Sequence, residues 1–164
     1  MLSIRPALKA DVPLILDLIR ALAEYEREPD KAVATADDLI RDGFTPGSAP
    51  KFRVVIAESD GAPAGFALFF YNYSTWNGRP GIYLEDLFVK PDFRKKGIGK
   101  ALLSHLAKIA VEEKCMRLEW QVLDWNTPAI DFYKSLGALH MKEWFNMRVT
   151  GEALPALAKA VPAQ

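Results

Sequence analysis

The strongest pattern in the chain is a helical repeat of apolar residues near its start. From Val12 to Ala23 an apolar side chain recurs at every third or fourth position, which is the spacing of one face of an α-helix. Asp11 precedes the repeat as a predicted N-cap, and Pro13 falls in the first turn, where its missing N–H costs little. The pattern predicts a helix that ends at about Glu26.

The remaining elements are predicted from apolar spacing together with capping and turn residues. Further helices are expected over Thr35–Gly43, where Thr35 and Asp38 resemble a capping box, from Gly97 to about Ala110, and over Thr127–Gly137. Strands are expected at Ser3–Ala7, Arg53–Glu58, Ala64–Tyr73, Ile82–Val89, Arg117–Leu123 and Trp144–Val149, with a weaker one near Ala138–Met141. Asp60 and Gly61 predict a hairpin turn. The order predicts an α/β domain around a central mixed sheet.

Composition narrows the class of protein. A chain of 164 residues can bury one core without disulfides or metals, and we expect one domain over 1–150 followed by a helical, partly frayed tail over 151–164. Lysine plus arginine equals aspartate plus glutamate at 21 each, so no net field favours nucleic acid or an anionic membrane. The single cysteine, Cys115, forms no internal disulfide, which fits a reducing cytoplasm. We therefore expect a cytoplasmic protein that binds neither nucleic acid nor membrane.

A basic, glycine-bearing loop joins a predicted strand to a predicted helix, and it comprises Arg94, Lys95, Lys96, Gly97, Ile98, Gly99 and Lys100. Glycines let backbone N–H groups approach a ligand, and a helix N-terminus favours negative charge, so the loop suits a pyrophosphate. The alternative is a solvated basic turn that only caps the helix. A Walker loop is excluded because Ala101 follows Lys100, and Leu102 stands where a dinucleotide-binding loop has its third glycine.

Two motifs carry a resemblance to a known superfamily. The pattern Arg-x-x-Gly-x-Gly from Arg94 to Gly99 resembles the acetyl-CoA signature of the GNAT N-acetyltransferases. The stretch from Asn126 to Ala138 resembles their Asn-x-x-Ala-x-x-Phe-Tyr-x-x-x-Gly-Phe segment, with Ala138 in place of the last Phe. More narrowly, the chain is similar to the diamine (spermidine/spermine) and thialysine N-acetyltransferases from Ile4 to roughly Ala138. The segments that carry this similarity are Ile4–Ala7, Leu22–Glu26, Asp42–Phe44, Tyr83–Val89 and Trp125–Asn126.

The resemblance implies a single GNAT domain whose mixed, mostly antiparallel sheet splays to admit acetyl-CoA. It implies direct transfer of acetyl to a primary amine of a small molecule such as a polyamine, thialysine or a lysine-like compound, in a homodimer. The aromatic region Phe66–Trp76 is a candidate dimer surface, unless its rings are core. The alternatives are a protein or peptide N-acetyltransferase and a non-catalytic CoA-binding regulatory domain. No metal is expected, because His105 and His140 lack partners at metal-ligand spacing.

Two residues are predicted to be catalytic. The resemblance places Tyr133 beside the CoA sulfur as general acid, and the alternative is a packed tyrosine with a bonded hydroxyl. Glu85 lies in an otherwise apolar strand, so it is a candidate base for the amine, a carboxylate that only binds the amine, or part of a structural ion pair. Strand alternation predicts that Glu85 and Leu87 share one face while Asp86 takes the other.

The other site residues are carried over by resemblance. The backbone of Leu87, Phe88 and Val89 is expected to pair with the pantetheine arm and to stabilise the oxyanion. Asn126 is expected to bond the pantetheine amide or to act only as a turn or N-cap residue, and Ala129 is expected to contact the cofactor. The expected amine channel comprises Tyr25, Glu26, Glu85, Asp86, Glu119, Trp120 and Gln121.

Overall fold

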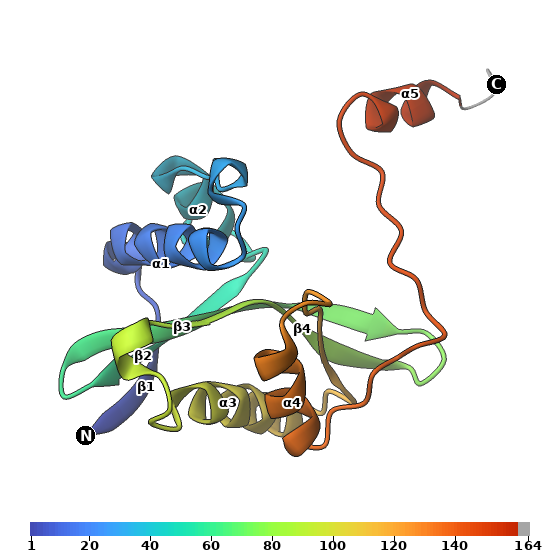
Figure 1. The fold of residues 1–164 in the computed structure, drawn as a ribbon. Coiled ribbons are helices and arrows are strands. Elements are labelled where there is room, and N and C mark those ends of the chain that lie inside the picture. The colour runs from blue at the N-terminus through green and yellow to red at the C-terminus, as the bar shows by residue number, and fades with distance from the viewer. Residues whose placement is uncertain (161–164) are drawn as a thin grey trace. The chain divides into compact units, whose positions relative to one another are not determined.

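The strands form one mixed sheet. In the computed structural model, which describes residues 1–160, they lie in the order β1-β2-β3-β4-β5. Neighbours from β1 to β4 are antiparallel, and β5 runs parallel to β4 (Figure 1). Their bounds are β1 (Leu2–Pro6), β2 (Arg53–Ser59), β3 (Ala62–Ser74), β4 (Arg79–Val89) and β5 (Leu118–Trp120). This confirms the predicted mixed, mostly antiparallel sheet.

Helices cover both faces of this sheet. α1 (Val12–Tyr25) and α2 (Ala36–Gly43) lie over one face, and α3 (Ile98–Glu112) lies under the other (Figure 1). Within residues 1–160 there are three short 3-10 turns, η1 (Lys9–Asp11), η2 (Pro29–Lys31) and η3 (Pro91–Phe93). These elements belong to one compact unit, Met1–Gln121. A second unit begins at Val122 and contains α4 (Thr127–Ser135) and α5 (Ala153–Lys159).

The apolar repeat of α1 forms the core on its face of the sheet. Ile15 and Leu18 are at most 1% exposed, and each such buried side chain contributes about 1.5–3 kcal/mol of hydrophobic stabilisation. The buried residues of this cluster are Val12, Ile15, Leu16, Leu18, Leu39, Val54, Phe66, Leu68 and Phe88. Because the cluster contains residues of α1, β3 and β4, it holds α1 against these two strands.

The predicted turn and capping residues are confirmed, with one difference. Thr35 and Asp38 form the capping box, with N–H to oxygen distances of 3.0 and 3.2 Å. Asp60 and Gly61 form the turn between β2 and β3 with positive φ. Asp11 stands at the N-cap of α1, but its carboxylate accepts hydrogen bonds from the Leu8 N–H at 2.7 Å and from Arg5 at 2.7 and 2.9 Å.

The strands predicted at Trp144–Val149 and Ala138–Met141 are wrong. Within residues 1–160 the chain between α4 and α5 contains no strand, and β5 is shorter than the predicted Arg117–Leu123. Phe145 and Met147 are 89% and 86% exposed. Apolar alternation forms a strand only where a neighbouring strand satisfies its backbone groups, and this segment has no such neighbour among the described residues. The tail contains a helix, α5; the predicted division at residue 150 stays a prediction.

Candidate active site

β4 contains a β-bulge at the predicted catalytic position. Leu68 of β3 pairs with Asp86 and Phe69 pairs with Leu84, so Glu85 is the extra residue. A bulge breaks the alternation of a strand and redirects its side chains. Asp86 and Leu87 take opposite faces as expected, because they pair with the consecutive residues Leu68 and Ala67, but the alternation expected for Glu85 does not hold. Direct cross-strand partners share a face, so Asp86 lies on the face of Leu68, the one that α1 covers.

Three carboxyl groups gather around this bulge: Glu26 at the C-cap of α1, exposed Glu85, and partly buried Asp86. Burial, and then the charges of Glu85 and Glu26, raise the pKa of Asp86 to about 6. Burial also raises the pKa of Glu26. We call these three residues the acidic cluster. A carboxyl group that titrates near neutral pH can accept a proton and release it again under physiological conditions.

The edge of β4 that faces β5 is open beside this cluster. β5 pairs with β4 only from Ile82 to Leu84, and no other strand in residues 1–160 pairs with that edge toward Val89. Phe88 is buried in the core cluster, so only its backbone is available to a ligand. An open strand edge can bind an extended ligand through main-chain hydrogen bonds. A gap between β4 and β5 beyond Leu84 is the arrangement expected of a sheet that splays.

Arg94 connects this strand to the end of α1. Its Nε donates to the carbonyl oxygen of Val89 at 3.0 Å, and its guanidinium lies over the rings of Tyr25 (4.7 Å to the centroid) and Phe88 (5.6 Å). Cation–π contacts of this kind contribute about 0.5–2 kcal/mol each. Arg94 is a predicted cofactor residue, and Tyr25 is a predicted residue of the amine channel. The contact between them therefore joins the two predicted parts of the site.

The predicted phosphate loop has the backbone that close approach requires. Gly97 is the N-cap of α3 with a left-handed φ of 79°, and Lys95 is left-handed as well. Lys96 donates to the carbonyl oxygen of Asp92 at 2.9 Å, and Lys95, Lys96 and Lys100 are all exposed. The loop therefore presents cationic side chains at the positive end of a 15-residue helix.

The remaining predicted cofactor residues lie on the second unit. Asn126 is the buried N-cap of α4, but its side chain forms no cap hydrogen bond. Ala129 and half-buried Tyr133 follow at positions i+3 and i+7, so all three share one face of α4. The Tyr133 ring contacts the Phe132 ring at 5.4 Å between centroids.

The three residues of the expected amine channel that lie on or just after β5 do not share one face of the sheet. Glu119 pairs with Tyr83 and shares its face, which is also the face of Asp86, whereas Trp120 pairs with Leu84 on the opposite face. Glu119 accepts a hydrogen bond from Asn72 at 2.8 Å and lies 2.8 Å from the Nε of Arg117. Gln121 follows the strand and is exposed. Glu119 is therefore a paired carboxylate that differs from the acidic cluster.

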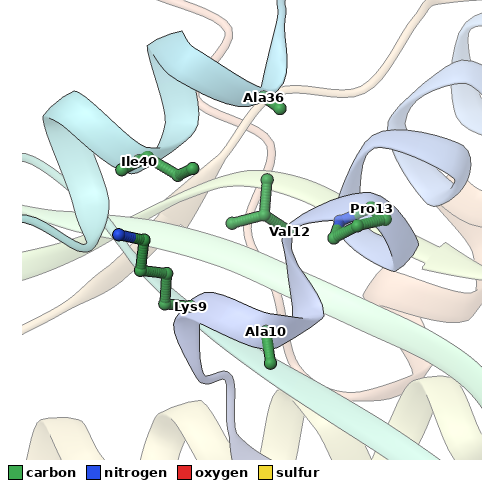
Figure 2. A pocket seen from close by; sticks show the side chains of 6 residues that line it. All are labelled: Lys9, Ala10, Val12, Pro13, Ala36 and Ile40. Atoms are coloured by element: carbon green, nitrogen blue, oxygen red, sulfur yellow. The ribbon is translucent and has the colours of Figure 1, made fainter.

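An apolar hollow of about 580 Å³ lies elsewhere, between η1 and the starts of α1 and α2. Figure 2 shows its lining side chains: Lys9, Ala10, Val12, Pro13, Ala36 and Ile40. It lies at the opposite end of α1 from Glu26, and α1 is about 21 Å long at about 1.5 Å per residue. Its lining offers one charged group and no acid or base pair, so it is not the candidate active site.

Two further features concern metal-ligating side chains and helix length. Residues 1–160 contain no group of three His, Cys, Asp or Glu side chains able to hold a metal ion. In the same range no helix is long and apolar enough to span a bilayer. His105 is half-buried and His140 is exposed.

Comparison with known proteins identifies the class. The Acetyltransferase (GNAT) family matches residues 15–138. A thialysine N-epsilon-acetyltransferase of Bos taurus is 42% identical over 166 residues, covering 94% of this chain and 96% of that protein. An L-ornithine N5-acetyltransferase of Arabidopsis thaliana is 34% identical, covering 95% and 87%. A solved integron cassette protein from the mobile metagenome of V. cholerae superposes with a TM-score of 0.76 at 33% identity, covering 97% and 98%.

The fold and these relatives define an enzyme of the acyltransferase class. The chain belongs to the Acetyltransferase (GNAT) family. The predicted resemblance to the GNAT and thialysine enzymes is thereby confirmed.

Proposed function

We propose that the enzyme transfers acetyl from acetyl-CoA to a primary amine of a small molecule. The observation that carries the proposal is the acidic cluster at the β4 bulge, in which the pKa of Asp86 is raised to about 6. A primary ammonium has a pKa of about 10.4 and must lose a proton before it attacks. Three neighbouring carboxyl groups attract that cation, and the raised pKa makes Asp86 an effective proton acceptor near neutral pH.

The donor side of the proposal rests on the open edge of β4 and the loop that follows it. The pantetheine arm pairs with the backbone of Leu87–Val89, and an N–H from this stretch stabilises the oxyanion. The pyrophosphate binds the N–H groups of the loop from Gly97 to Gly99 with help from its cationic side chains. By resemblance to the family, the proposal also includes Asn126 and Ala129 as residues that contact the cofactor.

The transfer is direct. The ammonium gives its proton to the acidic cluster, with Asp86 as the favoured acceptor and Glu85 as a second base or an amine ligand. The nitrogen then bonds to the thioester carbonyl carbon, the carbon–sulfur bond breaks, and the second proton that the nitrogen loses on becoming an amide restores the Tyr133 hydroxyl. Tyr133 gives its hydroxyl proton to the departing thiolate; the two groups have ordinary pKa values of about 10 and 8.5, so the transfer is nearly matched.

The relatives support a small, linear acceptor. Proteins 42% and 34% identical to this chain are named for thialysine and L-ornithine, which carry a primary amine on a short chain. We further propose that the enzyme is a homodimer. We also propose that it is cytoplasmic, because a single cysteine fits a reducing compartment.

A screen of acetyl-CoA consumption over an amine panel tests the function. The panel holds polyamines, lysine-like amino acids, aminoglycosides and a peptide with a free N-terminus, with thiol release and product mass as readouts. We expect amine-dependent thiol release and an acetylated product from at least one small amine. Turnover of the peptide alone, or CoA binding without turnover of any amine, contradicts the proposal.

A further inference from the structure

A second polar group lies on the same sheet face as the acidic cluster. Arg117 Nε lies 2.8 Å from Glu119 Oε2, and the same oxygen accepts the Asn72 amide at 2.8 Å. About a third of the Arg117 side chain and two fifths of the Glu119 side chain remain exposed, at 35% and 40%. We call Arg117 and Glu119 the distal ion pair.

The register places the distal ion pair and Asp86 on one face. Asp86 pairs with Leu68 and Tyr83 with Phe70, and Leu68 and Phe70 are two residues apart on β3. Glu119 pairs with Tyr83. At about 3.3 Å per residue and about 4.8 Å between strands, the Cα atoms of Asp86 and Glu119 are about 8 Å apart. An extended lysine spans about 6 Å from Nζ to Cα, which is similar to this separation, so its two ends can lie near the two carboxyl groups on this face.

An aromatic floor lies between the two polar ends. The rings of Phe70 and Tyr83 stack with centroids 5.1 Å apart and planes inclined by 30°. Both residues are partly buried and lie on the face of Asp86 and Glu119. The face thus offers an acidic end, an apolar middle and an end with both charges. This matches a linear amine whose far end is also charged.

The surroundings of the distal ion pair fix its side chains. A Cβ on Gly81 would lie 2.5 Å from Asn72 Oδ1 and 2.9 Å from Arg117 Cγ, so only glycine leaves space for both. Arg117 Nε is buried and lacks a well-directed hydrogen bond despite its closeness to Glu119. Within residues 1–160 the Arg117 side chain pairs with Glu119 alone. Two of the three guanidinium nitrogens are therefore left to bind an anion, in the forked geometry that suits a carboxylate.

Resting on the proposed acetyl transfer to an amine, we propose that Arg117 determines specificity by binding a carboxylate on the acceptor. Glu119 binds the α-ammonium beside that carboxylate, while the side-chain amine reaches the acidic cluster. The acceptor is then an amino acid with a terminal amine. A polyamine would place a second cation against Arg117.

Matched acceptors test this inference. Lysine, lysinamide and cadaverine share the reacting amine, but only lysine carries a carboxylate. We expect wild-type kcat/KM for lysine to exceed that for the other two at least tenfold. Arg117→Met should lower the lysine value by roughly 10- to 100-fold, mainly through KM, and change the cadaverine value by less than about twofold. Arg117→Lys, which keeps the charge, should recover part of the loss.

Arg53→Met is the matched control, because Arg53 also pairs with a glutamate, Glu113 at 3.2 Å, but lies opposite Phe69 on the other face. It should leave all three acceptors unchanged. Equal wild-type use of lysine and cadaverine, or an equal loss on both in Arg117→Met, overturns the inference and makes the pair structural. Thermal unfolding shows whether each variant is folded. If the wild type acetylates no small amine at all, the proposed function itself has failed.

Discussion

Asp86 has a carboxyl group that costs stability when it is charged. Its pKa rises from an ordinary 3.8 to about 6 in the folded chain, chiefly through burial. Between those values the folded state binds more protons than the unfolded state, so this group makes stability fall as pH rises. A shift of about two units corresponds to at most ~3 kcal/mol at neutral pH.

The stability of Asp86→Asn should therefore depend on pH. Asn carries no charge to bury, so we expect the variant to be about 1–3 kcal/mol more stable than wild type at pH 8. The gain should vanish near pH 4, where the folded wild type is already protonated. Denaturant unfolding at both pH values measures it. A variant that is less stable than wild type at pH 8 contradicts the assigned pKa.

Rate profiles separate the roles of Glu85 and Asp86. If Asp86 takes the proton, Asp86→Asn should lower kcat/KM about a hundredfold at pH 7, with a smaller defect as pH rises and more amine arrives neutral. Glu85→Gln should show a loss in KM that varies little with pH, as for a carboxylate that only binds the amine. The reverse pattern assigns the base to Glu85.

Among the elements, the start of α3 is the proposed binding site for the pyrophosphate of the cofactor. Gly97 is left-handed, so substitution there adds backbone strain. Gly99 lies in the first turn of α3, where another residue can adopt the same backbone. We expect Gly99→Val to fold and to bind CoA at least tenfold more weakly in calorimetry, because its side chain blocks close approach to the loop. Ser104→Val, at an exposed position of α3, is the control. Unchanged affinity in a folded Gly99→Val variant would falsify the pyrophosphate site.

Local signals predicted most of these elements, because apolar spacing and capping residues act within a few positions. The repeat from Val12, the Thr35 capping box and the glycine at position 97 all lie where they were expected. The bulge at Glu85 was missed, since a bulge depends on the register with β3. Without it, the unusual pKa of Asp86 could not be foreseen; the adjacent acidic pair in an apolar strand was the only signal.

Residues 138–149 and the distal ion pair also depend on contacts with distant parts of the chain, which local sequence patterns do not reveal. Alternating apolar residues predicted strands that need a neighbour, and the sheet in residues 1–160 ends at β5. Arg117 and Asn72 lie 45 positions apart in the sequence, so only the pairing of β3, β4 and β5 brings them to one carboxylate.

For the whole molecule, the proposed homodimer is a claim that can be tested independently of the catalytic mechanism. Phe66 and Phe69 are core residues, 0% and 1% exposed, whereas Tyr73 and Trp76 are 61% and 91% exposed near the β3–β4 turn. The predicted aromatic region is thus part core and part surface. We expect light scattering to give a dimer mass at micromolar concentration and Trp76→Ser to weaken the dimer, because an exposed ring contributes most when an interface buries it. A monomer mass for the wild-type chain contradicts the dimer.

Thiol release from acetyl-CoA by Tyr133→Phe tests the central claim most directly. The substitution removes one hydroxyl from a half-buried side chain and leaves its ring packing in place. If this hydroxyl protonates the departing thiolate, amine-dependent turnover should fall at least about a hundredfold, while acetyl-CoA affinity stays within about twofold. Tyr71→Phe, which removes a hydroxyl from β3, is the control and should keep its turnover. Wild-type turnover in Tyr133→Phe contradicts the proposed mechanism.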